Sequence, residues 1–327
     1  MVSIITVNYN GLADTCEMIA SFRKHETHPY EIIVVDNGSR MPEADEIKLR
    51  HPEVKVVQNT NTGFAGGNNA GLTVAEGNYL FFLNNDTIIK EPILETLIHR
   101  LEAAPQNGGV SPMLKYSYAP DTLQYAGFTP FSRITLRNAA IGFNEKDQPS
   151  YRIACETASL HGAAMMVRRD ALQQAGTMTE IYFLFYEEFD WSAQLHRAGY
   201  KLWYEPEAVV YHKESMTAKK GTPLREFYLS RARILYARRN IPGGEKILSC
   251  LYVTNGDHVE IFNVLIETNH VKLEFIVLEL FAQGVKDLLE GKGNISVRLK
   301  LALGHIREVT HRYLSLIHIS EPTSLRR

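Results

Sequence analysis

The segment YLFFLNNDT, residues 79–87, is a short apolar run that changes abruptly into amide and carboxylate side chains. Similar apolar runs occupy residues 2–7, 31–36 and 54–58, and stretches with helical spacing separate them. Continuous apolar strands that alternate with helices are typical of a parallel sheet covered on both faces. The sequence therefore predicts an α/β fold of the Rossmann-like kind, with a mainly parallel sheet flanked by helices.

Polar side chains follow each of these four apolar runs, at the point where the run stops. In a parallel sheet the carboxyl ends of the strands share one edge, and ligands bind there. Single polar residues after strands are common, but four strand ends that all turn polar predict a binding site. The residues concerned are Asn8, Asn10, Asp36, Asn37, Asn59, Asn61, Asn84, Asn85 and Asp86.

The rest of the chain shows no internal repeat. Residues 110–155 contain four prolines, so we expect loops and short strands over the sheet there. A strand at 202–211 is expected to be broken by Pro206. Helical spacing is predicted at residues 12–20, 43–51, 92–101, 169–175 and 187–199, with Pro92 as a first helical residue, and a short helix ends at Gly77. A further helical pattern begins near residue 223.

These patterns divide the chain into three parts. Residues 1–240 form the predicted α/β domain, and residues 241–313 form a helical C-terminal extension. Parts of that extension are rich in apolar residues interrupted by charges, which would suit packing against a membrane surface. The segment 314–327 (LSLIHISEPTSLRR) does not continue the helical pattern and looks like translated sequencing-adaptor sequence, so we expect it to be non-native.

Composition and charge exclude several classes of protein. The formal net charge is −2, so no strongly basic field exists to attract nucleic acid. The cysteines are few, odd in number and widely spaced, which suits a reducing compartment. The N-terminus lacks the features of a signal peptide, and no apolar run reaches the roughly 18 residues of a membrane span. We expect a cytoplasmic protein, with contact to the inner face of the cell membrane left open.

Two motifs suggest phosphate or metal chemistry. Asp86 could hold a hard divalent cation, Mg²⁺ or Mn²⁺, that bridges to a substrate diphosphate; the plainer interpretation is a turn after the strand. The glycine-rich segment 61–71 (NTGFAGGNNAG) permits close approach to an anion, or it simply supplies small residues for a helix start. It is not a Walker A loop, because no Gly-Lys-Ser/Thr follows.

Three further side chains are candidates for a site. The Asp36 carboxylate can accept hydrogen bonds from a nucleobase or a ribose hydroxyl, or cap the next segment. On a helix, Glu188 shares the apolar stripe of Trp191, where burial would raise its pKa and suit a general base; a favourable interaction with the helix dipole is the alternative. His212 could be a third metal ligand, although a lone histidine is more often structural.

In this order, the segments resemble family 2 glycosyltransferases, and more narrowly their bacterial rhamnosyltransferase-type branch. The resemblance covers about residues 2–240 and implies a GT-A fold with an inverting single displacement. The matching segments are VSIITVNYNG at 2–11, EIIVVDNGS at 31–39, NTGFAGGNNAGL at 61–72, YLFFLNNDT at 79–87, HGAAMMVRRDAL at 161–172, FYEEFDWSAQLHRAGYK at 185–201 and the pair Tyr211-His212.

The resemblance also implies roles for individual residues. Glu188 would deprotonate the acceptor hydroxyl, and because it replaces the Asp of the family's usual Glu-Asp pair, Glu187 or Asp190 could serve instead. His161 and Gly162 would lie near the acceptor. The metal, Mg²⁺ or Mn²⁺, would be held by Asn84, Asp86 and His212, mostly by Asp86 since Asn fills the first place of the family's D-x-D-like motif. The residues that would bind the nucleotide sugar are Val7, Asn8, Asn10, Asp36, Gly66, Asn69 and Asn85.

The resemblance favours thymidine diphosphate-rhamnose as donor, with UDP- or GDP-sugars as alternatives. The acceptor would be a hydroxyl of a cell-surface glycan or a lipid-linked saccharide, and the arginine-rich segment 224–240 could be either a plain amphipathic helix or a contact to anionic lipid. A catalytically inactive scaffold is the alternative from another class, which the intact Asp86, Glu188 and His212 disfavour. A sugar-phosphate nucleotidyltransferase is less favoured, because residues 8–12 lack a glycine-rich signature carrying Arg or Lys.

Overall fold

The computed structural model describes residues 1–214, 223–243, 245–246 and 249. The predicted helical extension at 241–313 lies almost wholly outside these residues, and the predicted non-native tail at 314–327 lies entirely outside them. Within the described ranges, no helix is long and apolar enough to cross a membrane.

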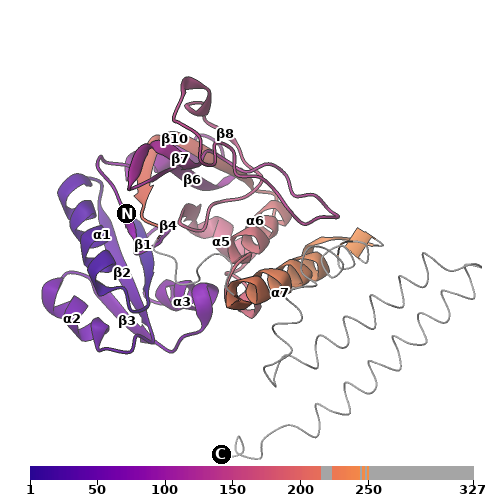
Figure 1. Cartoon of the computed structure of the whole chain (residues 1–327). Coiled ribbons are helices and arrows are strands. Elements are labelled where there is room, and N and C mark those ends of the chain that lie inside the picture. Colours follow the sequence, from indigo (N-terminus) through magenta and orange to yellow (C-terminus); the bar gives the residue numbers. More distant parts are fainter. Residues whose placement is uncertain (215–222, 244, 247–248, 250–327) are drawn as a thin grey trace, which may run out of the picture.

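A ten-stranded sheet forms the centre of the molecule (Figure 1). Its first half consists of four parallel strands in the order β3-β2-β1-β4. These strands correspond to the four apolar runs of the sequence, so the prediction of a mainly parallel sheet is confirmed in this half. They are β1 (Val2–Asn8), β2 (Tyr30–Asn37), β3 (Lys55–Asn59) and β4 (Tyr79–Leu83).

The second half of the sheet is mixed. Strand β9 (Ala164–Arg168) runs antiparallel between β4 and β6 (Asn107–Tyr116), and β6 is parallel to β10 (Lys201–His212). The edge strand β5 (Thr87–Ile88) pairs antiparallel with β10. Two further strands pair outside this path: β7 (Ala119–Tyr125) with β6, and β8 (Cys155–Glu156) with β10.

Helices cover both faces of the sheet, as the uninterrupted apolar strands require. Neighbouring strand residues point to opposite faces, so Ile4 and Phe81 belong to one buried cluster while Ile5 and Phe82 belong to another. The first cluster packs under α1 (Leu12–His25), α2 (Glu43–Arg50) and α4 (Leu94–Glu102). The second packs under α3 (Gly63–Leu72), α5 (Arg169–Ala175) and α6 (Glu187–Arg197).

Two expectations about the middle of the chain were wrong. Residues 107–125 form two long strands rather than irregular loops, and all ten residues of β6 are buried despite Pro112. Strand β10 continues through Pro206, because its register against β6 shifts between Glu205 and Val209. Such an irregularity accommodates the missing N–H of a proline without ending the strand.

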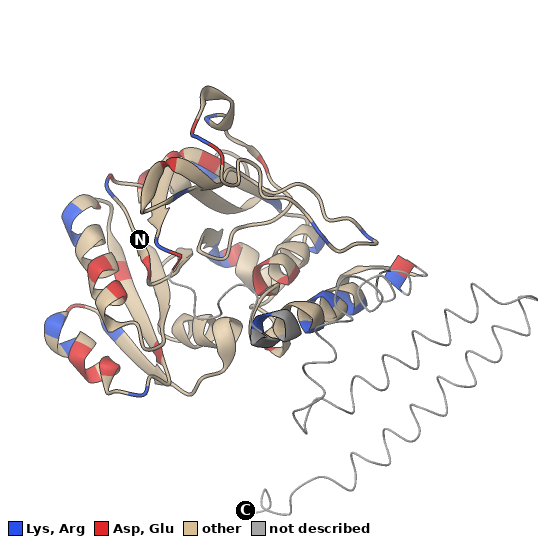
Figure 2. Cartoon of the chain, in the orientation of Figure 1, with Lys and Arg blue, Asp and Glu red and all other residues tan. Residues whose placement is uncertain are grey.

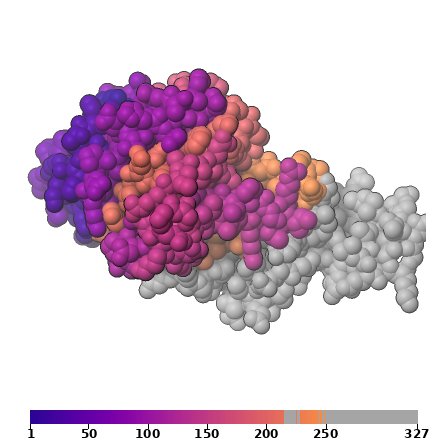
Figure 3. Space-filling model, turned by 90° about the horizontal axis from the view of Figure 1, so that it is seen from above, coloured from indigo at the N-terminus to yellow at the C-terminus, as the bar shows by residue number. Residues whose placement is uncertain are grey.

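Helix α7 (Pro223–Asn240) lies beside α6 at one side of the molecule (Figures 1 and 3). Figure 2 shows basic residues along this helix. Arg231 donates to the backbone oxygens of Ile181 and Tyr182, in the short 3₁₀ helix η2 (Glu180–Tyr182), and Arg239 donates to the Asp190 carboxylate. Two of the arginines of this amphipathic helix therefore hold the fold together.

Candidate active site

A cavity of about 380 Å³ opens at the carboxyl edge of the parallel strands. The walls come from the ends of β1, β2, β4 and β10, from the start of α3 and from the loop that precedes α6. Seven of the residues predicted at this edge line the cavity: Val7, Asn37, Asn61, Asn84, Asn85, Asp86 and His212. The other lining residues are Tyr9, Gly63, Phe64, Gln124, Phe183, Leu184, Phe185 and Glu214.

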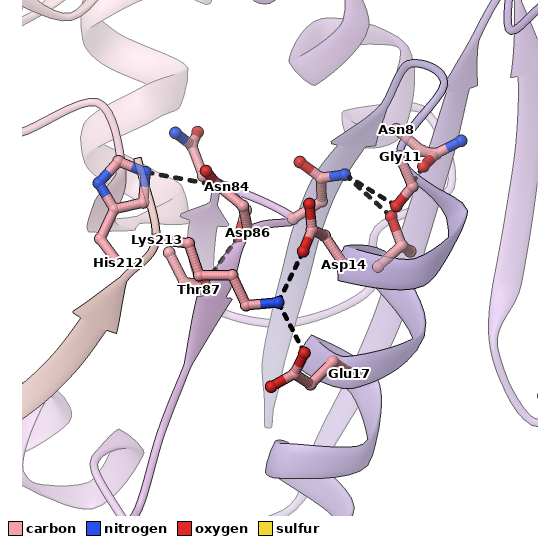
Figure 4. A network of polar contacts seen from close by, with 11 residues as sticks. Asn8, Gly11, Asp14, Glu17, Asn84, Asp86, Thr87, His212 and Lys213 are labelled. Atoms are coloured by element: carbon pink, nitrogen blue, oxygen red, sulfur yellow. Dashed lines mark hydrogen bonds and ion pairs between the residues drawn. The ribbon is translucent and has the colours of Figure 1, made fainter. Parts of the chain in front are cut away.

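Asp86 and His212 form a buried pair on the cavity wall. The His212 Nε2 atom lies 3.0 Å from Asp86 Oδ1, and both side chains are less than a tenth exposed (Figure 4). The fold brings them together because Thr87, next in the chain after Asp86, pairs with His212 across β5 and β10. The backbone N–H of Lys213 also donates to the Asp86 carbonyl oxygen, which fixes the turn that carries the carboxylate.

The two asparagines before Asp86 connect it to other parts of the site. The Asn84 N–H donates to the carbonyl oxygen of Ala163, so the segment that contains Gly162 adjoins this turn. The Asn85 carboxamide donates to the Thr15 hydroxyl at 3.0 Å and reaches toward the Gly11 carbonyl oxygen. Asn85 thus ties the turn after β4 to the loop after β1.

Asp36 lies at the end of β2 and belongs to a network beside the cavity. Its Oδ1 accepts hydrogen bonds from Asn8 Nδ2 at 3.1 Å and from the Ser39 hydroxyl at 2.5 Å. The same Asn8 amide group donates to Glu43 at 2.8 Å, while the Asn8 oxygen accepts from Thr15. Since Thr15 is also the partner of Asn85, a continuous set of side chains joins Asp36 to the turn that carries Asp86.

The loop after β1 is further fixed at Asn10. Its backbone adopts a left-handed conformation, with φ of 52°, its N–H donates to Ser39 and its side-chain oxygen accepts from the Arg40 N–H. Asn8 and Asn10 therefore shape the loop around Asp36, whereas the neighbouring residues Val7, Tyr9 and Asn37 face the cavity.

Gly66 and Asn69, which were predicted to bind the nucleotide sugar, have structural contacts on α3. The Asn69 carboxamide donates to the Met178 carbonyl oxygen and to Glu180. A Cβ on Gly66 would lie 2.3 Å from the Thr62 hydroxyl oxygen. The cavity wall is formed instead by Gly63 at the start of the helix, which has φ of 78° and no room for a side chain against the Phe183 carbonyl oxygen.

Glu188 lies beside Gly162, at the start of α6. A Cβ built on Gly162 would lie 3.6 Å from the Glu188 carboxyl carbon. Burial raises the pKa of Glu188 to about 7. Burial, and then the charge of Glu188, also raise the pKa of Glu187, whose Oε1 is buried without a hydrogen-bond partner. Two carboxyl groups in so apolar a place cannot both ionise easily.

Asp190 is the third carboxylate of this segment and points toward α7. Although burial opposes ionisation, hydrogen bonds from Arg239 and Asn240 hold the pKa of Asp190 below its usual value. Thr179, Tyr182 and Gln194 donate to it as well. Five donors give Asp190 a well-defined structural role in fastening α7 to α6.

His161 lies in an aromatic environment on the other side of Gly162. Its ring is stacked on Phe128 at 5.7 Å between centroids and meets Tyr125 edge-on at 5.0 Å. Burial lowers the pKa of His161 to about 3. The ring is therefore neutral, and its Nδ1 accepts a hydrogen bond from the Ala163 N–H.

The structure thus gathers most of the predicted residues in one region. Asp86 and His212 touch directly, the Ala163 backbone links this pair to Gly162 and Glu188, and the Asn8–Thr15–Asn85 contacts link it to Asp36. Sequence reasoning assigned no role to Tyr9, Gln124 or residues 183–185 as cavity residues. Phe183 and Phe185 have positive φ, which no glycine or asparagine announces in the sequence.

The amino-acid sequence is similar to those of several glycosyltransferases. The pre-mycofactocin glycosyltransferase of Mycobacterium tuberculosis is 26% identical to this chain over 210 residues, which cover 63% of this chain and 42% of the relative. Another relative from that organism, N-acetylglucosaminyl-diphospho-decaprenol L-rhamnosyltransferase, is 23% identical over 242 residues, covering 66% of this chain and 77% of the relative. An uncharacterised glycosyltransferase of Haemophilus influenzae is 28% identical over 105 residues, which are 32% of this chain and 36% of that protein. The chain thus spans less than half of the length of some curated relatives that it matches.

Solved structures show the fold. The S. aureus TarS fragment 1–349 matches with a TM-score of 0.53 at 15% identity, covering 96% of this chain and 91% of that one. The Pyrobaculum calidifontis mannosyltransferase PcManGT, in complex with GDP-Man and Mn²⁺, matches with a TM-score of 0.51 at 15% identity over 96% of this chain and 86% of that one. These likenesses confirm the expected GT-A fold. The model of the glycosyl transferase family 2 matches residues 3–176, which is more than half of the 327 residues, and the chain therefore belongs to glycosyl transferase family 2.

Proposed function

We propose that this protein is an inverting glycosyltransferase that moves a sugar from a nucleoside-diphosphate sugar to an acceptor hydroxyl. The observation that carries the proposal is the buried Asp86–His212 pair on the cavity wall, connected through Ala163 and Gly162 to a carboxylate of raised pKa, Glu188. A cation-binding pair and a base at the same sheet edge are what this transfer needs.

The residues present suit a divalent cation, Mg²⁺ or Mn²⁺. Asp86 and His212 offer a carboxylate and an imidazole nitrogen 3.0 Å apart, and Asn84 adds a carboxamide on the same cavity wall. Among the residues that the structure describes, no three His, Cys, Asp or Glu side chains are placed together to hold a metal ion. Water and substrate phosphate would complete the shell of an ion bound to Asp86 and His212. When bound, the ion would stabilise the charge on the departing diphosphate. The solved structure of PcManGT contains Mn²⁺, and so does that of GalNAc-T7, whose fold matches with a TM-score of 0.56 at 15% identity over 93% of this chain and 55% of that one.

Glu188 is the proposed base. It accepts the proton of the acceptor hydroxyl as that oxygen bonds to the anomeric carbon, while the bond from this carbon to the diphosphate oxygen breaks. Attack from the face opposite the leaving group inverts the anomeric configuration. Glu187 and Asp190 suit this role less well, because Glu187 is 1% exposed and its burial raises its pKa, whereas Asp190 accepts from five donors.

The nucleotide would lie against the loop after β1 and the end of β2. Asp36 can accept a hydrogen bond from the nucleobase or ribose, and Asn8, Asn10 and Asn85 keep that loop in place. Val7 would contact the nucleotide directly, since it lines the cavity. Gly66 and Asn69 would act indirectly, through the placement of α3.

Thymidine diphosphate-rhamnose remains the favoured donor, and a lipid-linked saccharide the favoured acceptor. Their support is the likeness to the mycobacterial L-rhamnosyltransferase, whose name specifies a diphospho-decaprenol acceptor. UDP- and GDP-sugars are the alternatives, because the GalNAc-T7 and PcManGT structures contain UDP and GDP-Man. We place the reaction in the cytoplasm, at the inner face of the membrane where such an acceptor would be reached.

A donor panel tests the proposal. The protein is incubated with Mn²⁺ or Mg²⁺, a short lipid-linked acceptor and each of a set of thymidine, uridine and guanosine diphosphate sugars, and release of nucleoside diphosphate is measured. We expect metal-dependent release with one donor and a product of inverted anomeric configuration by NMR. A retained configuration would contradict the single displacement. If none of the donors gives nucleoside diphosphate release, an inactive scaffold would be favoured.

A further inference from the structure

Gln124 on β7 contacts the proposed metal ligand His212 from the side opposite Asp86. Its Oε1 lies 2.8 Å from His212 Nδ1, and its side chain is only 6% exposed although it lines the cavity. His212 therefore lies between two buried acceptor oxygens, one on each ring nitrogen.

An irregularity of the sheet aims Gln124 at this ring. Leu114 pairs with Tyr125 and the next residue, Lys115, pairs with Leu123, so Gln124 is the extra residue of β7. Leu123 is held on its other side by backbone hydrogen bonds with Asn144 and Glu145. Such bulges occur next to active sites, where they redirect a side chain.

The contact fixes which nitrogen of His212 carries its proton. A carboxamide oxygen can only accept, so Nδ1 must donate to Gln124. When the ring carries a single proton, this proton is on Nδ1, and Nε2 then presents a lone pair toward the Asp86 carboxylate, 3.0 Å away. A lone pair and a carboxylate at this distance repel each other unless a proton or a cation lies with them.

We propose that Gln124 is a positioning residue that holds His212 in the tautomer whose Nε2 can bind the metal. The inference rests on the proposed function, in which Asp86 and His212 bind the divalent cation. An uncharged acceptor suits this place, because it orients the ring without adding another negative charge beside Asp86. The opposite arrangement, with the Gln124 amide donating to Nδ1, would leave Nε2 protonated and unable to bind a metal.

Mn²⁺ titration of the intact protein, followed by the EPR signal of free Mn²⁺, tests this proposal without turnover. Gln124→Met keeps the volume but removes the acceptor, and we expect its Mn²⁺ dissociation constant to be about 10–100-fold higher than that of the wild type. Gln124→Glu keeps an acceptor oxygen and should bind Mn²⁺ at least as tightly as the wild type. Gln106→Met is the matched control, since Gln106 is exposed and lies just before β6, at the opposite end of this strand from Tyr116, which pairs with His212.

The outcomes separate this inference from the proposed function. Wild-type affinity in Gln124→Met would overturn the role of Gln124 and leave the metal site intact. If Gln124→Met melts at a lower temperature than the wild type, the Mn²⁺ affinity of Gln124→Glu is the deciding measurement. Because Gln124→Glu keeps the acceptor oxygen, a loss of Mn²⁺ binding in both variants would also overturn the proposal. Sugar transfer by a wild type that binds no Mn²⁺ would remove the metal site, and with it the role of Gln124.

Discussion

Glu188 adjoins the open space beside Gly162: a Cβ on Gly162 would lie 3.6 Å from the carboxyl carbon of Glu188. That distance is an ordinary van der Waals contact, so Gly162→Ala should fold with a free energy of unfolding within about 0.5 kcal/mol of the wild type. The added methyl group would occupy space beside the base, where we expect the acceptor hydroxyl to approach. We predict about a tenfold lower kcat/KM for the acceptor, with unchanged donor KM. Wild-type acceptor kinetics in this variant would place the acceptor elsewhere.

The pH dependence of the rate reports the ionisation of the base. Burial raises the pKa of Glu188 to about 7, and only the ionised carboxylate accepts a proton. We predict that kcat/KM falls about tenfold for each pH unit below this value and is constant above it. The measurement is the pH profile of the wild type between about pH 5 and 9. A rate that is flat across this range would contradict the assignment.

Glu187 supplies the control for this profile. If Glu187 is neutral while Glu188 titrates, Glu187→Gln leaves the acid limb of the profile in place. The raised pKa of Glu187 also affects the stability of the protein. A buried carboxyl group with a raised pKa favours the folded state at low pH, and this preference is lost as the pH rises above 4.5, the pKa of the group in the unfolded chain. Glu187→Gln should therefore raise the melting temperature at pH 8 and leave it unchanged near pH 4. Loss of activity as severe as in Glu188→Gln would identify Glu187 as the base.

Gly11 and Asn85 should act as a coupled pair in donor binding. A Cβ on Gly11 would lie 2.5 Å from Asn85 Nδ2, so Gly11→Ala must rotate this side chain away from Thr15. We predict a several-fold rise in donor KM for both Gly11→Ala and Asn85→Ala. Because both changes break the same contact, the double variant should resemble either single one. Additive effects on donor KM would show that the contact does not hold the loop.

Arg239 should contribute to stability through Asp190. Arg239→Met removes the cation from a fully buried carboxylate that keeps four neutral donors, so we predict a loss of about 1–3 kcal/mol in urea denaturation. Because the pKa of Asp190 is lowered in the folded protein, this contribution to stability is present at pH values above the usual carboxyl pKa of 3.8. It is lost as the pH falls through the lowered pKa of the folded state. The neighbouring exposed Arg238, changed to Met, is the control. Equal stability of the two variants would contradict this role.

The sequence was sufficient for the parallel half of the sheet. The apolar runs of β1, β2 and β4 and the polar residues after them are local patterns, and they led to Asp86 and Asp36. The meeting of Asp86 with His212 could be predicted only through the family resemblance, because it depends on the pairing of β5 with β10.

Other parts of the site depend on contacts that a single sequence does not display. Gln124 reaches His212 because of a bulge in β7, within a region whose prolines favour loops. Phe183, Phe185 and Tyr186 have positive φ, although non-glycine residues rarely adopt it. Asp190 was an alternative to Glu188 as the base, and its contacts with Arg239 and Asn240 of α7, which give it a structural role, do not show in the local sequence pattern.

In the proposed mechanism, Asp86 acts in metal-assisted donor binding and Glu188 acts in proton transfer. Calorimetric titration of the donor nucleotide with Mn²⁺, combined with single-turnover transfer, measures both steps in Asp86→Ala and Glu188→Gln. We predict that Glu188→Gln binds the nucleotide as the wild type does but transfers at least about a thousandfold more slowly, while Asp86→Ala loses the Mn²⁺-dependent part of binding. Near-normal transfer by Glu188→Gln, or unchanged Mn²⁺-dependent binding by Asp86→Ala, would contradict the account.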